Sequence, residues 1–409
     1  MKKLILNNEL IKNMALNIIA NVVPICFLQL VLLPFLSRFL DSEEYGLMVT
    51  IIAVLNVVPS TLGNTLNNIR LLHNKKYIEN NCNGDFNIML LMGSLINIII
   101  LIFYSVFCLK VEYSGRNLIT HILLIILLSI FWIIREYFIV AFLIDVRYDK
   151  ILVNNIILTL GYLVGYCLFQ MTLLWEVVYI AGYLLSDLHL LKDTMLWKEP
   201  LKITKLFYTT CKEYVLFVIA CIIARLITYA DKLLLFPILG GTVVSIYYVA
   251  TLSSKVILLL ISPISNVILN YLSKSDRTSI KSFVKMLKLG TIICVLGYCF
   301  SMFITEPVLK IIYPDYVEMA MKYVYLTTLT AMIRVLIGLI NPYILCFLSM
   351  KWQMLINLIT LFMYIFISLI LLKKWGLYGF CIGGVITNLF KMLVMISLFI
   401  FQKHKECKV

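Results

Sequence analysis

The fold class follows from one stretch, Glu213 to Asn270, which reads EYVLFVIACIIARLITYADKLLLFPILGGTVVSIYYVATLSSKVILLLISPISNVILN. Two apolar segments flank a short turn at Leu239–Thr242, and the charged side chains within them are Arg225, Asp231, Lys232 and Lys255. A cation at the centre of a lipid bilayer costs about 2.5–3.5 kcal/mol. Charges in such segments therefore indicate a protein-lined, wet interior, and we expect the function to lie on these helices.

The composition excludes a soluble globular protein. Of the 409 residues 62% are hydrophobic and only 14% are charged, whereas soluble domains carry nearer a quarter charged residues. The net charge of +14 is spread in short bursts between apolar runs, which is the pattern of membrane topology and not of a nucleic-acid-binding patch. The 11 cysteines form no CxxC pair or Cys/His cluster, so the sequence predicts no metal site or cofactor.

The hydrophobic runs predict an all-α polytopic membrane protein. A membrane-spanning helix needs about 20 apolar residues. On that rule we expect about twelve helices, at 14–39, 46–71, 86–109, 118–142, 151–171, 173–191, 213–238, 245–270, 283–304, 320–348, 352–372 and 376–401.

The basic residues predict the orientation. If the N-terminus is cytoplasmic, most of the 35 Lys and Arg residues fall in inner segments, and the outer segments hold only Arg38, Lys110, Arg116, Lys310, Lys322, Lys373 and Lys374. This bias predicts that both termini are cytoplasmic. The first residues, MKKLILNNELIKNM, break their apolar run with Asn and Glu, which favours a cytoplasmic leader over a signal peptide.

A weak internal repeat predicts two lobes of six helices. The longest cytoplasmic connection runs from about Leu191 to Lys212, and we expect lobes at 1–195 and 213–409 joined by a linker at 196–212. An ungapped alignment of the halves places Phe39–Met48 on Ile238–Tyr247 and Asn67 on Asn266. Because each lobe would contain an even number of helices, the lobes would be parallel repeats about an axis along the membrane normal.

Two predicted helices carry stripes of polar residues. The stripe in 46–71 is Asn56, Ser60, Asn64 and Asn67, and the stripe in 245–270 is Lys255, Ser262, Asn266 and Asn270. Pro59 and Pro263 interrupt these helices, and we expect both to kink them. Interhelical hydrogen bonds worth about 0.6 kcal/mol each explain a single Asn, but two matched stripes with nearby basic residues favour a polar lumen.

The intramembrane charges predict an anionic cargo. Basic residues within the predicted helices outnumber acids, and Arg and Lys are the natural partners of phosphate. We expect the lumen to be lined by Arg225, Lys232, Lys255, Arg334, Lys391, Asn56, Asn64, Asn67, Asn266 and Asn270. Arg334 and Lys391 could equally be structural, Glu136 could pair with Arg135, and Asp231 with Lys232 or Arg225. No phosphate loop, HExxH or GxSxG motif is present, so we do not expect an enzyme.

Several turns resemble the polysaccharide-exporter branch of the MATE-like (MOP) superfamily. These segments are FLDSEEYGLM at 39–48, Asp231–Leu234 with Leu239–Gly240, Ile246–Ala250, and Ile312–Ala320. Ser245 stands where the pattern commonly has Gly. The resemblance implies a two-lobed transporter that works by alternating access.

The resemblance further implies a Wzx-type flippase in the bacterial inner membrane. Such a protein moves undecaprenyl-diphosphate-linked oligosaccharide repeat units for O-antigen (lipopolysaccharide) or capsule biosynthesis. The cationic lumen would hold the diphosphate, and downhill flow or an H⁺ or Na⁺ gradient would drive transport, with Glu136 and Asp231 as the protonatable residues. A polysaccharide polymerase and a chain-length regulator are the expected protein partners, beside membrane lipid; no nucleic acid is expected.

The sequence leaves other classes open. A multidrug exporter of the same fold usually needs an acidic cavity for cationic drugs, whereas this interior is predicted to be basic. A membrane O-antigen polymerase or glycosyltransferase usually has a large outer loop with catalytic Arg residues, and no such loop is found here. A structural membrane protein would leave the buried charges unexplained.

Overall fold

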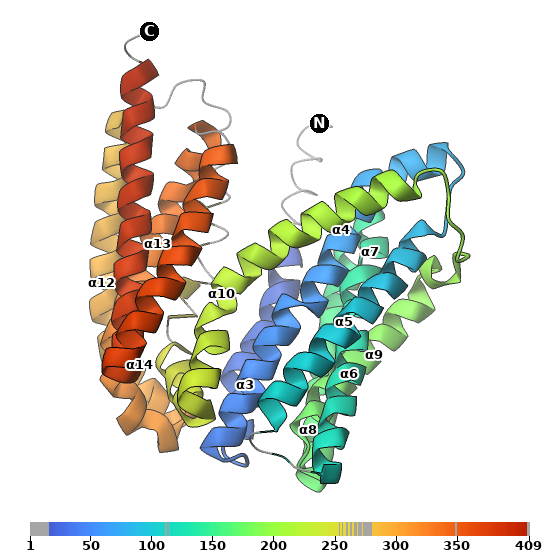
Figure 1. Cartoon of the computed structure of the whole chain (residues 1–409), viewed down its shortest axis with the longest axis horizontal. Helices are drawn as coiled ribbons and strands as arrows, with labels where there is room; N and C mark the ends of the chain where they lie inside the picture. Colours follow the sequence, from blue (N-terminus) through green and yellow to red (C-terminus); the bar gives the residue numbers. More distant parts are fainter. Residues whose placement is uncertain are drawn as a thin grey trace. The chain divides into compact units, whose positions relative to one another are not determined.

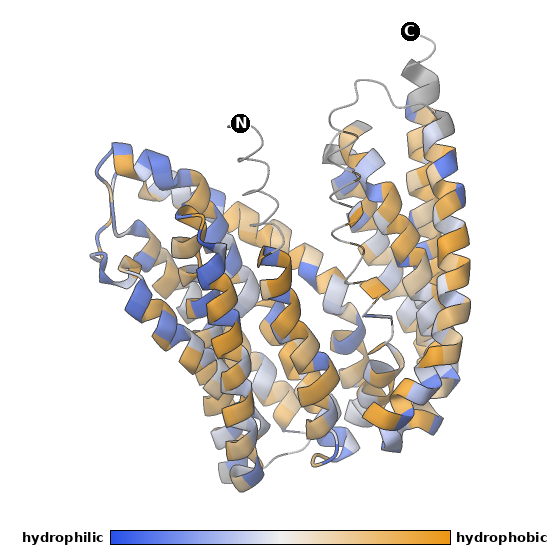
Figure 2. Cartoon of the chain, turned by 180° about the vertical axis from the view of Figure 1, so that it is seen from behind, coloured by the Kyte–Doolittle hydropathy of each residue, from blue (hydrophilic) through white to orange (hydrophobic). Residues whose placement is uncertain are grey.

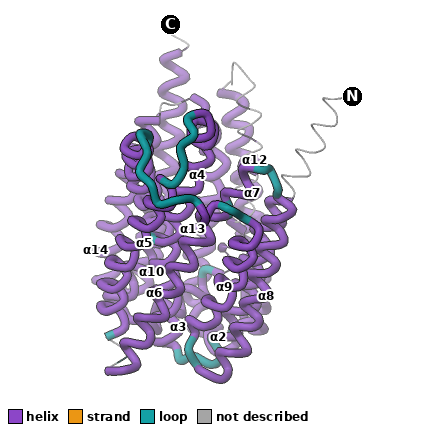
Figure 3. Tube along the Cα trace, turned by 90° about the vertical axis from the view of Figure 1, so that its right-hand side faces the viewer, coloured by secondary structure: helices purple, strands orange, loops and turns teal. Residues whose placement is uncertain are grey.

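The computed structural model describes residues 16–110, 113, 115–252, 280–347 and 350–406, together with isolated positions between 254 and 272. Within these residues the chain is almost entirely helical and contains no β-strand (Figure 1). The loops in this part of the chain are short and lie at the ends of the helices (Figure 3). The prediction of an all-α architecture is therefore confirmed.

The helices have the length and composition of membrane spans. In the described part of the chain nine segments qualify, at Leu16–Leu36, Ser42–Glu79, Asp85–Leu109, Asn117–Ile144, Tyr148–Thr172, Phe207–Ala250, Ser282–Ile312, Pro314–Cys346 and Leu355–Gln402. Hydrophobic residues run along these helices and hydrophilic residues gather at many of their ends (Figure 2). This confirms the prediction of a polytopic membrane protein.

The described part of the chain contains nine apolar spans, fewer than the twelve expected helices, for three reasons. Helix α9 (Trp175–Asp193) matches the predicted segment 173–191, but its polar content keeps it out of the nine apolar spans. Helix α14 (Met350–Glu406) contains both last predicted helices, which are separated only by non-helical Trp375 and Gly376. Ten of the 26 residues of the predicted segment 245–270, Pro263 among them, lie outside the described residues, and its first residues, 245–250, continue α10.

The chain divides into two compact units, Met1–Gly241 and Thr242–Val409. The first contains η1 (Leu28–Leu32), α2 (Leu33–Leu36), α3 (Ser42–Val57), α4 (Pro59–Glu79), α5 (Asp85–Leu109), α6 (Gly115–Phe138), α7 (Val140–Ile144), α8 (Tyr148–Thr172), α9 and η2 (Leu196–Lys198). It also contains most of α10 (Phe207–Ala250). This division follows packing, and the predicted boundary at residues 196–212 stays a prediction.

Close helix packing organises the first unit. Helix α6 packs against α4, α5 and α9, and α8 packs against α9. At the α8–α9 contact the two backbones meet at glycines, because a Cβ added to Gly161 would lie 2.7 Å from the Cα of Gly182. Small residues allow membrane helices to approach in this way. A buried hydrogen bond of 2.8 Å from Asn97 to Ser129 joins α5 to α6.

Pro59 interrupts the second predicted helix, as expected. Helices α3 and α4 are separated at Val58, and Pro59 begins α4. Proline has no backbone N–H and cannot continue the hydrogen-bond ladder of the preceding helix. The break lies between Asn56 and Ser60, in the middle of the polar stripe, so the two residues belong to different helices.

A second break occurs in α10 at Gly240, whose φ of +79° favours glycine. The carboxylate of Glu43, in the first turn of α3, accepts a 2.7 Å hydrogen bond from the N–H of Gly241. A Cβ on Gly46 would lie 1.9 Å from the Gly241 carbonyl oxygen. The two turns that the repeat aligns therefore touch each other through their backbones.

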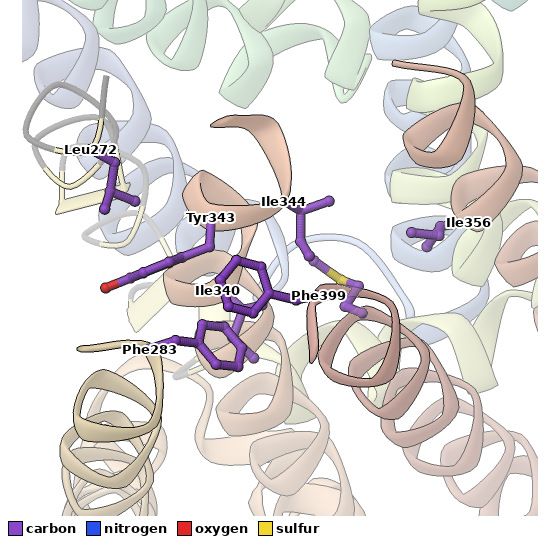
Figure 4. Close-up of a cluster of buried hydrophobic side chains, with 8 residues drawn as sticks. Leu272, Phe283, Ile340, Tyr343, Ile344, Ile356 and Phe399 are labelled. Carbon is purple, nitrogen blue, oxygen red and sulfur yellow. The ribbon is translucent and has the colours of Figure 1, made fainter. Parts of the chain in front are cut away.

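The second unit is built on α12 (Ile280–Ile312), η3 (Pro314–Tyr316), α13 (Val317–Phe347) and α14. Helix α13 packs against both α12 and α14. An apolar cluster holds the helices together, and its buried residues include Phe283, Tyr343 and Phe399 (Figure 4). At Gly376, whose φ is +58°, α14 breaks, and the backbone at Gly383 packs against Ser368.

Candidate functional site

The α3–α4 break positions the first candidate cluster. The guanidinium of Arg225 donates from Nη1 to the carbonyl oxygen of Asn56 at 2.8 Å and to the hydroxyl of Ser60 at 2.9 Å. These residues flank Pro59, where the helical ladder is interrupted. Arg225 is half-buried, and the described residues provide no carboxylate for it. The structure thus brings together a cation and two polar residues that the sequence analysis selected separately.

The polar stripe continues along α4 through Asn64, but it then differs from the prediction. Asn64 accepts a 2.9 Å hydrogen bond from Asn68, and both are half-buried. Asn67 is buried and donates to the backbone carbonyl of Glu136 at 3.0 Å. The half-exposed stripe therefore reads Asn56, Asn64 and Asn68, while Asn67 connects α4 to α6. The four-residue spacing of these asparagines is a signal that could have identified Asn68.

Lys232 forms a local ion pair. Its ammonium lies 3.1 Å from both carboxylate oxygens of Asp231 and 5.7 Å from the centre of the Tyr229 ring. The side chains of Lys232 and Asp231 are only 9% and 16% exposed. Of the alternatives left open by the sequence, the structure shows the pairing within the helix. Lys232 therefore brings little net charge to the site.

Glu136 lies at the edge of a buried polar cluster in the first unit. Its carboxylate is 3.8 Å from Arg135 Nη1 and its side chain is 20% exposed. Arg135 itself is buried, donates to Ser186 at 3.0 Å and also hydrogen-bonds Asn155. These bonds tie α6 to α8 and α9. Arg135 therefore serves helix packing, and Glu136 has a cation beside it.

The second unit carries its own cluster on α13 and α14. Arg334 Nε donates to Asn388 at 3.4 Å, and Lys391 Nζ donates to Asn357 at 3.1 Å. The two cations lie on helices that pack against each other. Among the described residues neither has a carboxylate partner. Asn357 and Asn388 were missed in the sequence, although Asn388 is three residues before Lys391 and thus on the same helix face.

Lys255, a predicted lumen residue, contacts an aromatic ring. The ammonium of Lys255 lies 3.3 Å from the centre of the Tyr248 ring, a cation–π contact. Asn266 and Asn270 lie outside the described residues. Of the basic residues predicted to line the lumen, Arg225 in the first unit and Arg334 and Lys391 in the second have amide, hydroxyl or carbonyl partners and no acidic neighbour in the described part of the chain.

Ionic contacts at the helix ends were not predicted. Arg70 hydrogen-bonds both carboxylate oxygens of Glu199 and donates to Tyr137 at 2.8 Å. At the predicted outer end, His121 Nδ1 lies 2.6 Å from Glu176, and both side chains are buried. Such pairs join segments far apart in the sequence. A single acid such as Glu199 shows that a charge is present but does not identify its partner.

Comparison with solved structures places the chain in a known fold. It is similar to a multidrug resistance MATE family transporter of the MOP superfamily in an inward-facing conformation, with a TM-score of 0.66 at 11% identity over 95% of this chain and 99% of that chain. It is also similar to the lipid II flippase MurJ, with a TM-score of 0.68 at 13% identity over 96% and 87%.

A third similar structure is a MOP superfamily transporter from Pyrococcus furiosus whose description names a binding pocket of reversed polarity. Its TM-score is 0.53 at 12% identity over 97% of this chain and 96% of that chain. No family model matches the sequence, and no curated protein matches it. The likenesses show that the chain has a MATE-like fold.

Proposed function

We propose that this protein is a membrane transporter that flips undecaprenyl-diphosphate-linked oligosaccharide repeat units across the bacterial inner membrane by alternating access. The cargo would supply O-antigen or capsular polysaccharide biosynthesis. The fold supports the transporter class, because the similar solved structures are described as MATE transporters and as a lipid II flippase. The finer assignment rests on the charges described above.

One observation carries the choice of cargo. Arg225, Arg334 and Lys391 lie on membrane-spanning helices and have amide or hydroxyl partners in place of carboxylates in the described structure. An unneutralised cation is costly in a membrane and is retained where an anion binds it. A diphosphate fits such groups, since guanidinium and ammonium ions donate charge-assisted hydrogen bonds to its oxygens.

The asparagine side chains near Arg225 suit the oligosaccharide part of the cargo. Asn56 of α3 and Asn64 and Asn68 of α4 are half-buried, and amide groups both donate and accept hydrogen bonds. Sugar hydroxyls need partners of both kinds. The polyprenyl chain would stay in the lipid, because the cost of removing it from an apolar environment grows with each methylene group.

The source of energy also belongs to the proposal. Transport would be driven by downhill flow or by an H⁺ or Na⁺ gradient, with Glu136 or Asp231 as the titrating group. Both carboxylates have a basic residue beside them, Arg135 at 3.8 Å and Lys232 at 3.1 Å. Release of such a partner during the transport cycle would change the proton affinity of the carboxylate. A polymerase and a chain-length regulator would act on the delivered units.

The proposal is tested with a strain that lacks the gene and carries it on a plasmid. We expect single lipid-linked repeat units to accumulate on the cytoplasmic side of the deletion strain, and the wild-type gene to clear them. Arg225→Ala should fail to clear them, whereas Lys322→Ala, which removes an exposed cation from α13, should behave as wild type. Clearance by Arg225→Ala at the wild-type rate would remove the residue from the proposal.

Other outcomes identify other functions. Units that reach the outer face but remain unpolymerised would indicate a polymerase. Unchanged surface glycan together with drug sensitivity in the deletion strain would indicate a multidrug exporter, the activity named for a transporter of the same fold. Either result would overturn the flippase proposal.

A further inference from the structure

In the connection between α9 and α10 several apolar side chains are exposed, whereas the threonines and the glutamate are buried or half-buried. Met195, Trp197, Leu201 and Ile203 are 68%, 49%, 64% and 65% exposed. Thr194 is buried, and Glu199 and Thr204 are half-buried. Water-exposed loops show the opposite arrangement, because burial of apolar side chains is favourable. We refer to residues 194–206 as the interfacial linker.

Polar contacts fix the interfacial linker to the first unit. The carboxylate of Asp85 accepts hydrogen bonds from the N–H of Thr204 at 2.7 Å and from its hydroxyl at 2.6 Å. The amide of Asn87 donates to the carbonyl oxygens of Leu196 and Glu199, both at 3.1 Å. Figure 1 shows the linker beside the α4–α5 loop. These bonds attach the backbone of the linker to the first unit.

The exposed surface of the interfacial linker is also basic. Lys198, Lys202 and Lys205 are exposed, and the ammonium of Lys198 lies 5.2 Å from the centre of the Trp197 ring. The only acid in the linker is Glu199, which is turned toward Arg70 and bound by it. The outward face therefore presents apolar groups and cations with no anion among them.

We propose that the interfacial linker lies in the boundary layer of the inner leaflet and that its lysines bind the headgroups of anionic phospholipids. Trp favours this layer. Lys side chains can extend their ammonium groups from apolar surroundings to the headgroups, and anionic lipids are concentrated on the cytoplasmic side. The boundary layer accommodates both the apolar side chains and the lysines, whereas water would solvate only the lysines well. The proposal does not depend on the cargo.

The test uses the full-length protein in nanodiscs of phosphatidylcholine with or without phosphatidylglycerol. We expect phosphatidylglycerol to raise the unfolding temperature of the wild type, and the variant Lys198→Gln/Lys202→Gln/Lys205→Gln to lose at least half of that increase. The matched control is Lys322→Gln/Lys373→Gln/Lys374→Gln, which removes equal charge from exposed lysines on the predicted outer side and should keep the full increase. Equal losses in the two triple variants would overturn the proposal.

A second measurement tests the depth of the linker without changing its charge. Brominated phosphatidylcholine quenches the fluorescence of tryptophans close to the lipid acyl chains. We expect a measurable part of the quenching in the wild type to be absent in Trp197→Phe. Equal quenching in the two proteins would overturn the membrane assignment and leave the surface to a soluble partner. Inorganic phosphate that stabilises the wild type as much as phosphatidylglycerol would instead indicate a simple anion site.

Discussion

Arg225 donates a 2.9 Å hydrogen bond to the hydroxyl of Ser60, and the same nitrogen reaches the carbonyl oxygen of Asn56 across the interruption at Pro59. This contact fixes the guanidinium at the α3–α4 break with polar atoms of the first unit alone. The Nε and Nη2 groups of Arg225 have no partner in the described residues. They are the groups that we propose to bind the diphosphate.

Substitutions of Arg225 test that role. Arg225→Ala removes the cation and should abolish transport, whereas Arg225→Lys keeps the charge but loses the planar fork and should restore only part of it. Ser60→Ala removes one anchoring bond, worth about 1 kcal/mol, and should lower transport less than Arg225→Ala does. The measurement is clearance of lipid-linked units, normalised to the amount of protein in the membrane. Full activity of Arg225→Ala would contradict the assignment.

Substitution of Lys391 tests whether this residue of the second unit binds cargo or only stabilises the fold. Because a cation within a membrane-spanning helix is costly, Lys391→Gln should leave the protein as stable as the wild type or more stable. Hydrogen bonds to charged groups contribute about 1.5–3 kcal/mol, so the same change should reduce transport by about tenfold or more if Lys391 binds cargo. Thermal unfolding and transport are measured on the same variant. A parallel loss of stability and transport would identify a structural residue.

Arg70 and Glu199 are expected to stabilise the first unit as a pair. Their side chains are 9% and 17% exposed, and breaking a buried pair by removing one partner costs about 3–5 kcal/mol. Arg70→Ala should therefore lower the unfolding temperature strongly, and Arg70→Ala/Glu199→Ala should recover part of the loss. A double variant that is destabilised by the sum of both single effects would show that the pair is not coupled.

The α8–α9 contact should tolerate no added methyl group at Gly161. Its Cβ would lie 2.7 Å from the backbone of Gly182, and overpacking of this kind costs about 1–3 kcal/mol. The control is Gly297→Ala in α12, where the added Cβ would lie 3.4 Å from the sulfur of Met332, an ordinary contact. We expect a lower unfolding temperature for Gly161→Ala alone. Equal effects in both variants would contradict the packing.

The overall fold could be predicted because the membrane imposes strong rules on sequence. Apolar length identifies the spans, and the break at Pro59 follows from the missing N–H of proline. The length of a local break in a helix was harder to predict. The sequence cannot tell that Trp375 and Gly376 form a break short enough to leave α14 nearly continuous. The turn expected at Leu239–Thr242 is confirmed by the break at Gly240.

The role of the selected residues in cargo binding stays a prediction, and the structure adds the contacts that their side chains make. Arg225 and Asn56, which were selected on separate grounds, are in contact. Asn67 was assigned to the polar stripe but turns to α6, because the helix places positions 64 and 68 on the half-exposed side. Lys232 is neutralised by its neighbour Asp231. Contacts between distant segments, such as Arg70 with Glu199, depend on tertiary packing and carry no sequence signal of their own.

The central claim is that the basic side chains serve to move an anionic lipid-linked cargo, and reconstitution tests it most directly. The purified protein would be placed in liposomes that contain a fluorescent polyprenyl-diphosphate oligosaccharide, and the fraction that becomes accessible to an impermeant quencher would be followed with time. We predict rapid access with the wild type and access at the rate of protein-free liposomes with Arg225→Ala. Equal rates for wild type and protein-free liposomes, under each ion gradient applied, would contradict the claim.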